Sequence, residues 1–93
     1  MTPREYAKKR VQVTGLYSRD SESLEVILAQ KPKIWLEMRK NAKTDSETNK
    51  LWEASEMGVE ETLLKLRMKR YEKQLSSLKT MLDVLSQEAR NII

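Results

Sequence analysis

The densest group of side chains suited to recognition chemistry lies between residues 31 and 43. This segment reads Lys-Pro-Lys-Ile-Trp-Leu-Glu-Met-Arg-Lys-Asn-Ala-Lys, with five cations around one tryptophan. Lysine and arginine bind the phosphates of a nucleic-acid backbone, and a base can stack on an indole or guanidinium plane. The predicted nucleic-acid-binding residues are therefore Lys31, Lys33, Arg39, Lys40 and Lys43.

One aromatic residue and a second basic group extend this prediction. Trp35 lies on an apolar helical face, so burial in a core and stacking with a base both remain open. The second basic group consists of Lys8, Lys9 and Arg10. It fits either a DNA-contacting arm or a solvated helix end.

The side chains that most often carry catalysis and bind metals are absent or scattered. The chain contains no histidine and no cysteine, which removes the commonest acid–base group and metal ligand as well as all thiol chemistry. Carboxylates such as Glu60 and Glu61 fit solvated positions in the first turns of a helix, where the helix dipole favours acids. The two glycines form no phosphate-binding loop. We predict a protein that is not an enzyme and that uses no metal or cofactor.

The charge is distributed unevenly along the chain. Residues 1–43 contain ten basic and five acidic side chains, whereas residues 44–93 contain eight basic and nine acidic ones. A basic half is typical of a phosphate-backbone binder, although a solvated helical surface has a similar composition. In the second half, acids concentrate between residues 45 and 61 and bases between residues 63 and 73.

The length and composition indicate one small helical domain over residues 1–93. A chain of 93 residues without cysteine has a thin core and no disulfides, and such small domains often gain stability from a partner chain. No apolar run approaches the roughly 18 residues of a membrane span, and no apolar segment follows the charged N-terminus. We therefore expect a cytoplasmic location and no membrane contact.

The N-terminal half is expected to form short helices. Thr2-Pro3-Arg4-Glu5 is a capping box with proline at the first helical position, which predicts a helix start. This helix is expected to end near residues 11–14, where β-branched residues cluster before Gly15. A second helix is predicted from residues 18–21. Pro32 either kinks that helix or begins a new one.

The C-terminal half carries the strongest periodic signal. After a polar loop at residues 41–49, one long helix is expected from residue 46 to the end. Its apolar side chains follow a heptad pattern, with steps of three and four residues. The heptad stripe consists of Leu64, Met68, Tyr71, Leu75, Leu78, Leu82, Leu85, Ala89 and Ile92. A second stripe beside it consists of Leu51, Trp52, Val59, Leu63 and Leu66.

The length of this helix determines the expected architecture. It would span roughly 65 to 70 Å, whereas a compact domain of this size has a diameter of about 30 Å. Short N-terminal helices cannot cover it, so the helix either folds back at Gly58 or packs against other subunits. Because no turn residue accompanies Gly58, we expect an unbroken helix. The predicted fold is all-α, with residues 1–43 as the DNA-binding part and residues 46–93 as an oligomerisation helix. The heptad stripe would join the subunits of a homo-oligomeric bundle or ring.

Several short motifs occur in the order found in a known protein family. They are Ala29-Gln30-Lys31, Leu36 with Arg39, and the string Trp52-Glu53-Ala54-Ser55-Glu56-Met57 before a long C-terminal helix. In these motifs the chain resembles the UvsY recombination mediators of T-even-type phages. The resemblance covers about two thirds of the chain, from Ala29 onward.

The resemblance implies a fold, a function and a setting. Members of that family are helical and assemble through their C-terminal helices into a ring, a heptamer in the best-known member. They bind single-stranded DNA and help to load a RecA-type recombinase onto DNA coated with single-strand-binding protein. The implied location is the cytoplasm of a phage-infected bacterium.

The family also implies DNA-binding residues. A Lys-x-Arg pair follows the Ala-Gln-Lys string in the family and contributes to DNA binding. Here the arginine falls on Arg39, but the lysine position is Glu37, so Lys40 or Lys33 would substitute. This chain is also shorter and lacks a matching N-terminal segment.

Two functions from different classes follow. The first is a single-stranded-DNA-binding mediator of DNA recombination and repair. The second is a helical structural or adaptor protein that forms homo-oligomers without binding nucleic acid. Salt dependence separates them, because only the first loses affinity for DNA as salt rises. A reader of double-stranded DNA ranks lowest, since no helix-turn-helix or zinc signature is present.

Overall fold

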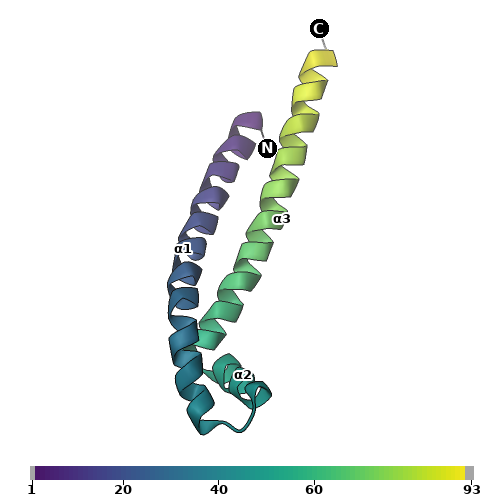
Figure 1. Cartoon of the computed structure of the whole chain (residues 1–93). Coiled ribbons are helices and arrows are strands. Elements are labelled where there is room, and N and C mark those ends of the chain that lie inside the picture. The colour runs from purple at the N-terminus through teal and green to yellow at the C-terminus, as the bar shows by residue number, and fades with distance from the viewer. Residues whose placement is uncertain (1, 92–93) are drawn as a thin grey trace.

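The computed structural model describes residues 2–91 and contains three helices, α1 (Pro3–Asn41), α2 (Asp45–Ala54) and α3 (Glu56–Asn91). The two long helices lie side by side and α2 closes one end (Figure 1). No strand occurs in this part of the chain, which confirms the all-α prediction. The molecule measures 70 × 20 × 16 Å and its radius of gyration is 20.0 Å. A compact domain of this size would have a radius of gyration near 12 Å.

The N-terminal half forms one helix rather than several short ones. The predicted cap is confirmed, because the Thr2 side chain accepts a hydrogen bond from the Glu5 amide at 3.2 Å. The predicted end at residues 11–14, the turn at Gly15 and the second start at residues 18–21 are wrong, since α1 continues for 39 residues. Glycine in a helix costs about 1 kcal/mol relative to alanine. Packing along α3 offsets that cost.

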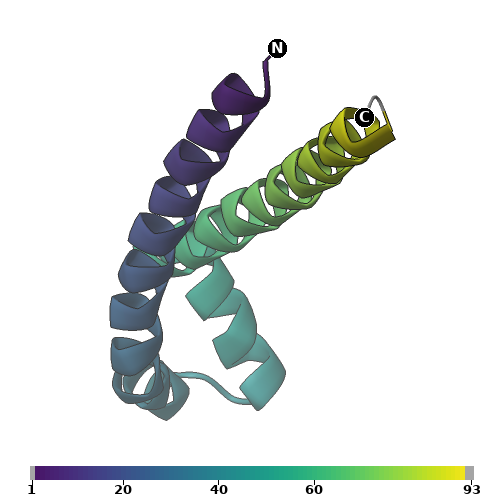
Figure 2. The same cartoon turned by 90° about the horizontal axis from the view of Figure 1, so that it is seen from above.

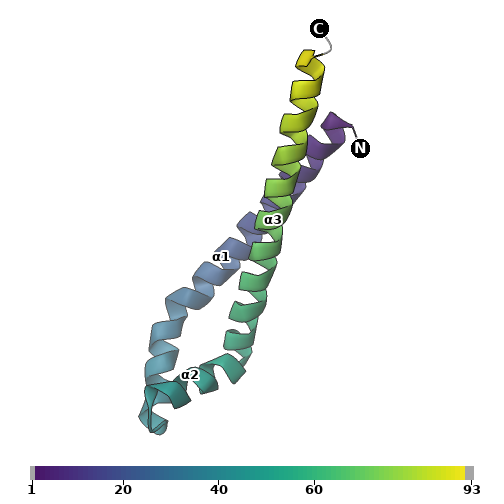
Figure 3. The same cartoon turned by 90° about the vertical axis from the view of Figure 1, so that its right-hand side faces the viewer.

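Pro32 lies inside α1 and does not end it. Its ring is exposed, and the helix continues for another nine residues to Asn41. Proline removes one backbone hydrogen bond and commonly bends a helix. Along its length α1 changes direction while remaining one element (Figure 3).

The segment predicted as a polar loop is mostly helix. Only residues 42–44 separate α1 from α2. Thr44 caps α2 by accepting from the Glu47 amide at 3.1 Å, and Glu47 accepts from the Lys43 amide at 3.1 Å. Together the two bonds cap the first turn of α2, with Glu47 reaching the amide one residue before the N-cap, so the cluster of polar residues begins a helix instead of extending a loop.

The predicted unbroken C-terminal helix is interrupted at Ser55. The Ser55 hydroxyl accepts from the Gly58 amide at 3.1 Å and thereby caps α3. A Cβ at position 58 would lie 1.7 Å from the Trp52 carbonyl oxygen. The turn between α2 and α3 therefore requires glycine for close backbone approach, and the expectation of a continuous helix through this point is wrong.

The two long helices form an antiparallel pair. Tyr17 donates a hydrogen bond to Glu72 at 3.2 Å, and Arg67 Nε lies 3.0 Å from Asp20 Oδ2. Nearer α2, Lys31 pairs with Glu61. The expectation that the chain could not cover its own heptad stripe is wrong, because α1 is long enough to run beside α3.

The heptad stripe of α3 faces α1. Leu64 is buried, Ala89 is exposed, and Ile92 lies outside the described residues. The other members, which are Met68, Tyr71, Leu75, Leu78, Leu82 and Leu85, are half-buried. The sequence predicts subunit contacts through this stripe because short N-terminal helices cannot cover it, but the long α1 packs along it instead.

The core is concentrated at the end closed by α2. Ile27, Trp52 and Leu64 are buried together there, one from each helix, and half-buried apolar side chains of α1 and α3 surround them. Beyond this cluster, toward the termini, Val13 is the one described residue of α1 that is buried. The two long helices cross at an angle in the view from above (Figure 2). We call the three-helix end the junction and the two-helix remainder the open half.

Candidate nucleic-acid interface

Lys31 belongs to the junction rather than to a free basic surface. Its Nζ atom lies 3.1 Å from Glu61 Oε1 and 5.3 Å from the centre of the Trp52 ring. The ion pair joins α1 to α3, and the cation–π contact joins α1 to α2. The charge of Lys31 is thus neutralised within the chain.

Glu61 is the centre of this junction. Its side chain is 6% exposed and accepts hydrogen bonds from Trp52 Nε1 at 2.6 Å, Lys65 Nζ at 2.8 Å and Lys31 Nζ at 3.1 Å. Burial alone would raise the pKa of Glu61, but the bonds from Lys65, Trp52 and Lys31 lower that pKa to about 2. The expectation that Glu61 is a solvated surface acid is therefore wrong.

A pocket of about 310 Å³ opens beside Glu61. Its lining includes Asn49 and Thr62 as well as the residues of the junction. The Glu61 carboxylate already accepts from three donors, so it is not free to act as a general base. Among the described residues, no group of three or more potential metal ligands comes together.

Periodicity in the sequence contains the signal that identifies Glu61. Position 61 lies three residues before Leu64, and Met68 follows four residues later, so Glu61 continues the heptad stripe toward the N-terminus. An acid at such a position faces the helix pair and requires a partner. The partner, Lys31, lies on α1, which is longer than the helices expected from the sequence.

Arg39 is engaged at the turn between α1 and α2. Its Nε atom lies 2.7 Å from Asp45 Oδ1, and an NH group donates to the Ala42 carbonyl at 2.8 Å. These contacts fix the three-residue connection between the helices. The arginine that matches the family motif is therefore half-buried and paired within the chain.

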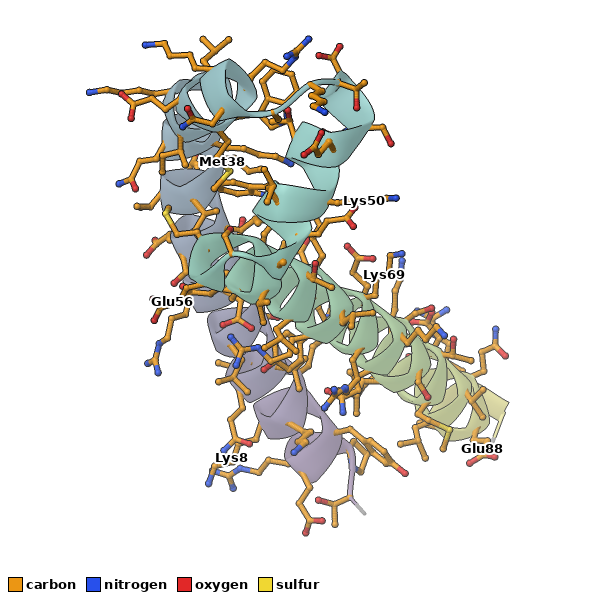
Figure 4. The ribbon with its side chains drawn as sticks, turned by 90° about the horizontal axis from the view of Figure 1, so that it is seen from below. Lys8, Met38, Lys50, Glu56, Lys69 and Glu88 are labelled. Carbon is orange, nitrogen blue, oxygen red and sulfur yellow. The ribbon has the colours of Figure 1, made fainter. Side chains whose placement is uncertain are left out.

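Trp35 packs against the core instead of presenting a free face. It contacts the buried cluster around Ile27, and its indole N–H donates to Asn49 Oδ1 at 2.9 Å. Of the two roles that the sequence left open, the structure shows the packing role. Met38 lies on the same side of α1, toward α2 (Figure 4).

Lys33 and Lys40 remain as exposed cations on the outer face of α1. With Leu36, Glu37 and Arg39 they line a shallow groove of about 500 Å³. Seven residues separate the two lysines, which corresponds to two helical turns or about 10 Å. Neither forms an ion pair within the part of the chain that the structure describes. They are therefore available to bind an external anion.

The remaining predicted cations are also exposed. Lys43 lies in the connection after α1, and Lys8, Lys9 and Arg10 lie in the first turns of α1. The Lys8 side chain points away from the helix pair (Figure 4). Since 25 residues separate Lys8 from Lys33, the two basic groups are about 37 Å apart along the helix. The structure thus divides the predicted site into two separate groups.

Comparison with known proteins gives no relative on which to base a function. No protein-family model matches the chain, and neither a curated protein nor a solved structure matches it. None of the described helices is both long and apolar enough to cross a membrane.

Proposed function

We propose that this protein binds single-stranded DNA without catalysing a reaction and acts, as a homo-oligomer, as a recombination mediator that helps to load a RecA-type recombinase. The observation that carries the proposal is the contrast between paired and unpaired cations on α1. Lys31 and Arg39 are held by carboxylates of the chain, whereas Lys33 and Lys40 are exposed and unpaired among residues 2–91. Unpaired surface cations bind phosphates by releasing counterions.

The exposed groups favour binding to the DNA backbone over reading of bases. Lys33 and Lys40 flank Leu36 on one helical face, and the indole of Trp35 is occupied by packing and by its bond to Asn49. Lysines contact phosphates without regard to sequence. We therefore expect affinity that is similar for different sequences and falls steeply with salt.

Assembly would strengthen this weak individual site. A few cations per subunit give modest affinity, but a strand that contacts two or more linked subunits gains avidity of about 10² to 10⁴. A strand held by repeated contacts would remain extended for a recombinase, which is the role that the family resemblance implies. A RecA-type recombinase and a single-strand-binding protein are the proposed partners in that role.

The double variant Lys33→Ala/Lys40→Ala tests the DNA-binding proposal. We expect weaker binding to a fluorescent oligothymidylate in anisotropy titrations at two salt concentrations. The slope of log affinity against log salt should become shallower by about 0.7 for each lost phosphate contact. Because these side chains are exposed and unpaired, the helical content measured by circular dichroism should remain unchanged.

A matched control is Lys50→Ala/Lys79→Ala, which removes the same charge from exposed positions on α2 and α3. It should leave the slope nearly unaltered. An equal loss of DNA affinity in both double variants would show that net charge, not the outer face of α1, attracts DNA. No binding by the wild type at low salt would favour the structural or adaptor function instead.

A further inference from the structure

The outer face of α3 carries an apolar patch that the chain itself leaves uncovered. Val59, Leu63 and Leu66 are 46%, 54% and 55% exposed, whereas Leu64, on the side facing α1, is 1% exposed. Their spacing of four and three residues places the three exposed side chains on one helical face. This face is most of the second stripe that the sequence shows beside the heptad stripe. Among the residues described, no element packs over it.

Unpaired charges of opposite sign flank this patch. Glu60 lies beside Val59 at the N-terminal end of the patch and Arg70 lies beyond its C-terminal end, and both are exposed. Neither forms an ion pair within residues 2–91. The asymmetry extends along α3, since Glu56 is also exposed in its first turn and Lys69 and Lys73 are exposed on either side of Arg70. The face is therefore negative at one end, apolar in the middle and positive at the other end.

We propose that a second copy of this chain covers the patch, with the two α3 helices antiparallel. An antiparallel register that sets Leu63 opposite Leu66 of the second copy brings each Arg70 within one residue of the position opposite Glu60. Both leucine pairs are buried and two symmetry-related ion pairs form at the ends, as an isologous twofold contact requires. A parallel arrangement would instead place Glu60 opposite Glu60 and Arg70 opposite Arg70, and like charges disfavour that alternative.

The size of the contact determines its expected strength. Residues 56–73 span about 27 Å of helix, so the interface is smaller than that of a standard stable complex. We expect a dimer that dissociates in the micromolar range. This inference rests on the self-assembly part of the proposed function and not on DNA binding. It moves the subunit contact from the heptad stripe, which faces α1, to the stripe beside it.

Analytical ultracentrifugation of the full chain without DNA tests the surface. The wild type should change from monomer to dimer as its concentration rises through the micromolar range. The variant Leu63→Gln/Leu66→Gln should weaken association at least tenfold and keep its helical circular dichroism. A matched control is Val11→Gln/Val26→Gln, which alters exposed apolar residues of α1 outside the groove between Lys33 and Lys40 and should associate like the wild type.

A charge exchange tests the antiparallel register. Glu60→Arg and Arg70→Glu should each weaken the dimer several-fold, because each sets two like-charged pairs against each other. The combined variant Glu60→Arg/Arg70→Glu should recover most of the wild-type association. Lys79→Glu, which changes the net charge as Arg70→Glu does but lies outside the contact, should have little effect.

Three results would overturn the proposal. They are a wild type that remains monomeric at several hundred micromolar, a larger oligomer that Leu63→Gln/Leu66→Gln leaves intact, and a combined charge variant as weak as the sum of its two single changes. Titration of the same variants with oligothymidylate separates this proposal from the DNA-binding proposal. A monomeric protein that binds DNA would contradict the α3 contact and self-assembly but not DNA binding, and a dimer that does not bind DNA would contradict the DNA-binding function alone.

Discussion

The inner and outer faces of α1 near Pro32 carry the same kinds of cation and use them differently. On the inner face, Lys31 is held by Glu61 and lies over Trp52. Two residues further along the helix, Lys33 is exposed on the outer face and has no ion-pair partner within the described chain. The number of basic residues therefore overstates the surface available to phosphate, because the junction uses part of that charge to hold the helices together.

Removal of the Trp52 side chain should have the largest effect on the folded state. Trp52 is 3% exposed and contributes to both the apolar cluster and the Glu61 network. We expect Trp52→Ala to lower the free energy of unfolding by about 3 to 5 kcal/mol, as large buried aromatic residues do. Urea denaturation followed by circular dichroism measures this loss. Trp35→Ala serves as a comparison, because Trp35 is half-buried, and a loss as large as that of Trp52→Ala would contradict the assignment of the core to the junction.

Acid should weaken the junction. The pKa of Glu61 is about 2 in the folded chain against an ordinary value of 4.5. A lowered pKa stabilises the fold above pH 4.5, and this contribution is lost as the pH falls from 4.5 toward 2. The difference corresponds to on the order of 3 kcal/mol. Urea midpoints measured across this range should fall for the wild type.

Glu61→Gln provides the control for that titration. This variant should be less stable near neutral pH, because Lys31 and Lys65 lose their shared carboxylate. It should also lose much of the dependence on pH between 4.5 and 2. An identical pH profile in the two proteins would place the acid-sensitive group outside the junction.

The two glycines should respond to alanine in opposite directions. A Cβ at position 58 would overlap the Trp52 carbonyl, whereas a Cβ at position 15 meets nothing within 4 Å. We expect Gly58→Ala to destabilise the fold by about 3 kcal/mol through overpacking. Gly15→Ala should stabilise it by up to about 1 kcal/mol through helix propensity. Thermal denaturation of both variants measures the difference, and destabilisation by Gly15→Ala would argue against an uninterrupted α1.

Replacing a leucine side chain by alanine should destabilise the protein less in the open half than at the junction. Leu78 and Leu82 are half-buried against α1, so Leu78→Ala and Leu82→Ala should each cost about 1 kcal/mol. Leu64→Ala at the junction should cost about 2 to 5 kcal/mol. Because α1 covers these leucines, their loss should lower the denaturation midpoint with little effect on association. If Leu78→Ala or Leu82→Ala dissociated an oligomer without lowering the denaturation midpoint, the heptad stripe would form the subunit contact.

Local signals in the sequence predicted part of this fold. The cap at Thr2 and the heptad stripe of α3 depend on neighbouring residues, and both are present in the structure. The break at Ser55 depends on how closely α2 approaches α3 at Gly58, and the continuity of α1 through Gly15 depends on packing against α3. These features arise from contacts between distant segments, which local propensity does not report.

The candidate site, too, could be predicted only in part from the sequence. Sequence patterns identified the basic segment around Lys33 and Lys40, whose exposure the structure shows. They did not reveal that Arg39 is held by Asp45 or that Lys31 is held by Glu61. Those two pairings require the turn after α1 and the antiparallel arrangement of the long helices. The Lys31–Glu61 pairing left one signal in the sequence. Glu61 continues the heptad stripe, and an acid on an apolar stripe needs a basic partner on the helix that it faces.

The salt dependence of DNA binding by the wild-type protein tests the central claim most directly. The measurement is the affinity for oligothymidylate, determined by fluorescence anisotropy between about 50 and 200 mM salt. We predict a straight line of log affinity against log salt with a negative slope, equal to about 0.7 for each phosphate contacted. Binding that does not change over this range, or no binding at its lower end, would contradict the claim that the unpaired cations of α1 form a single-stranded-DNA interface.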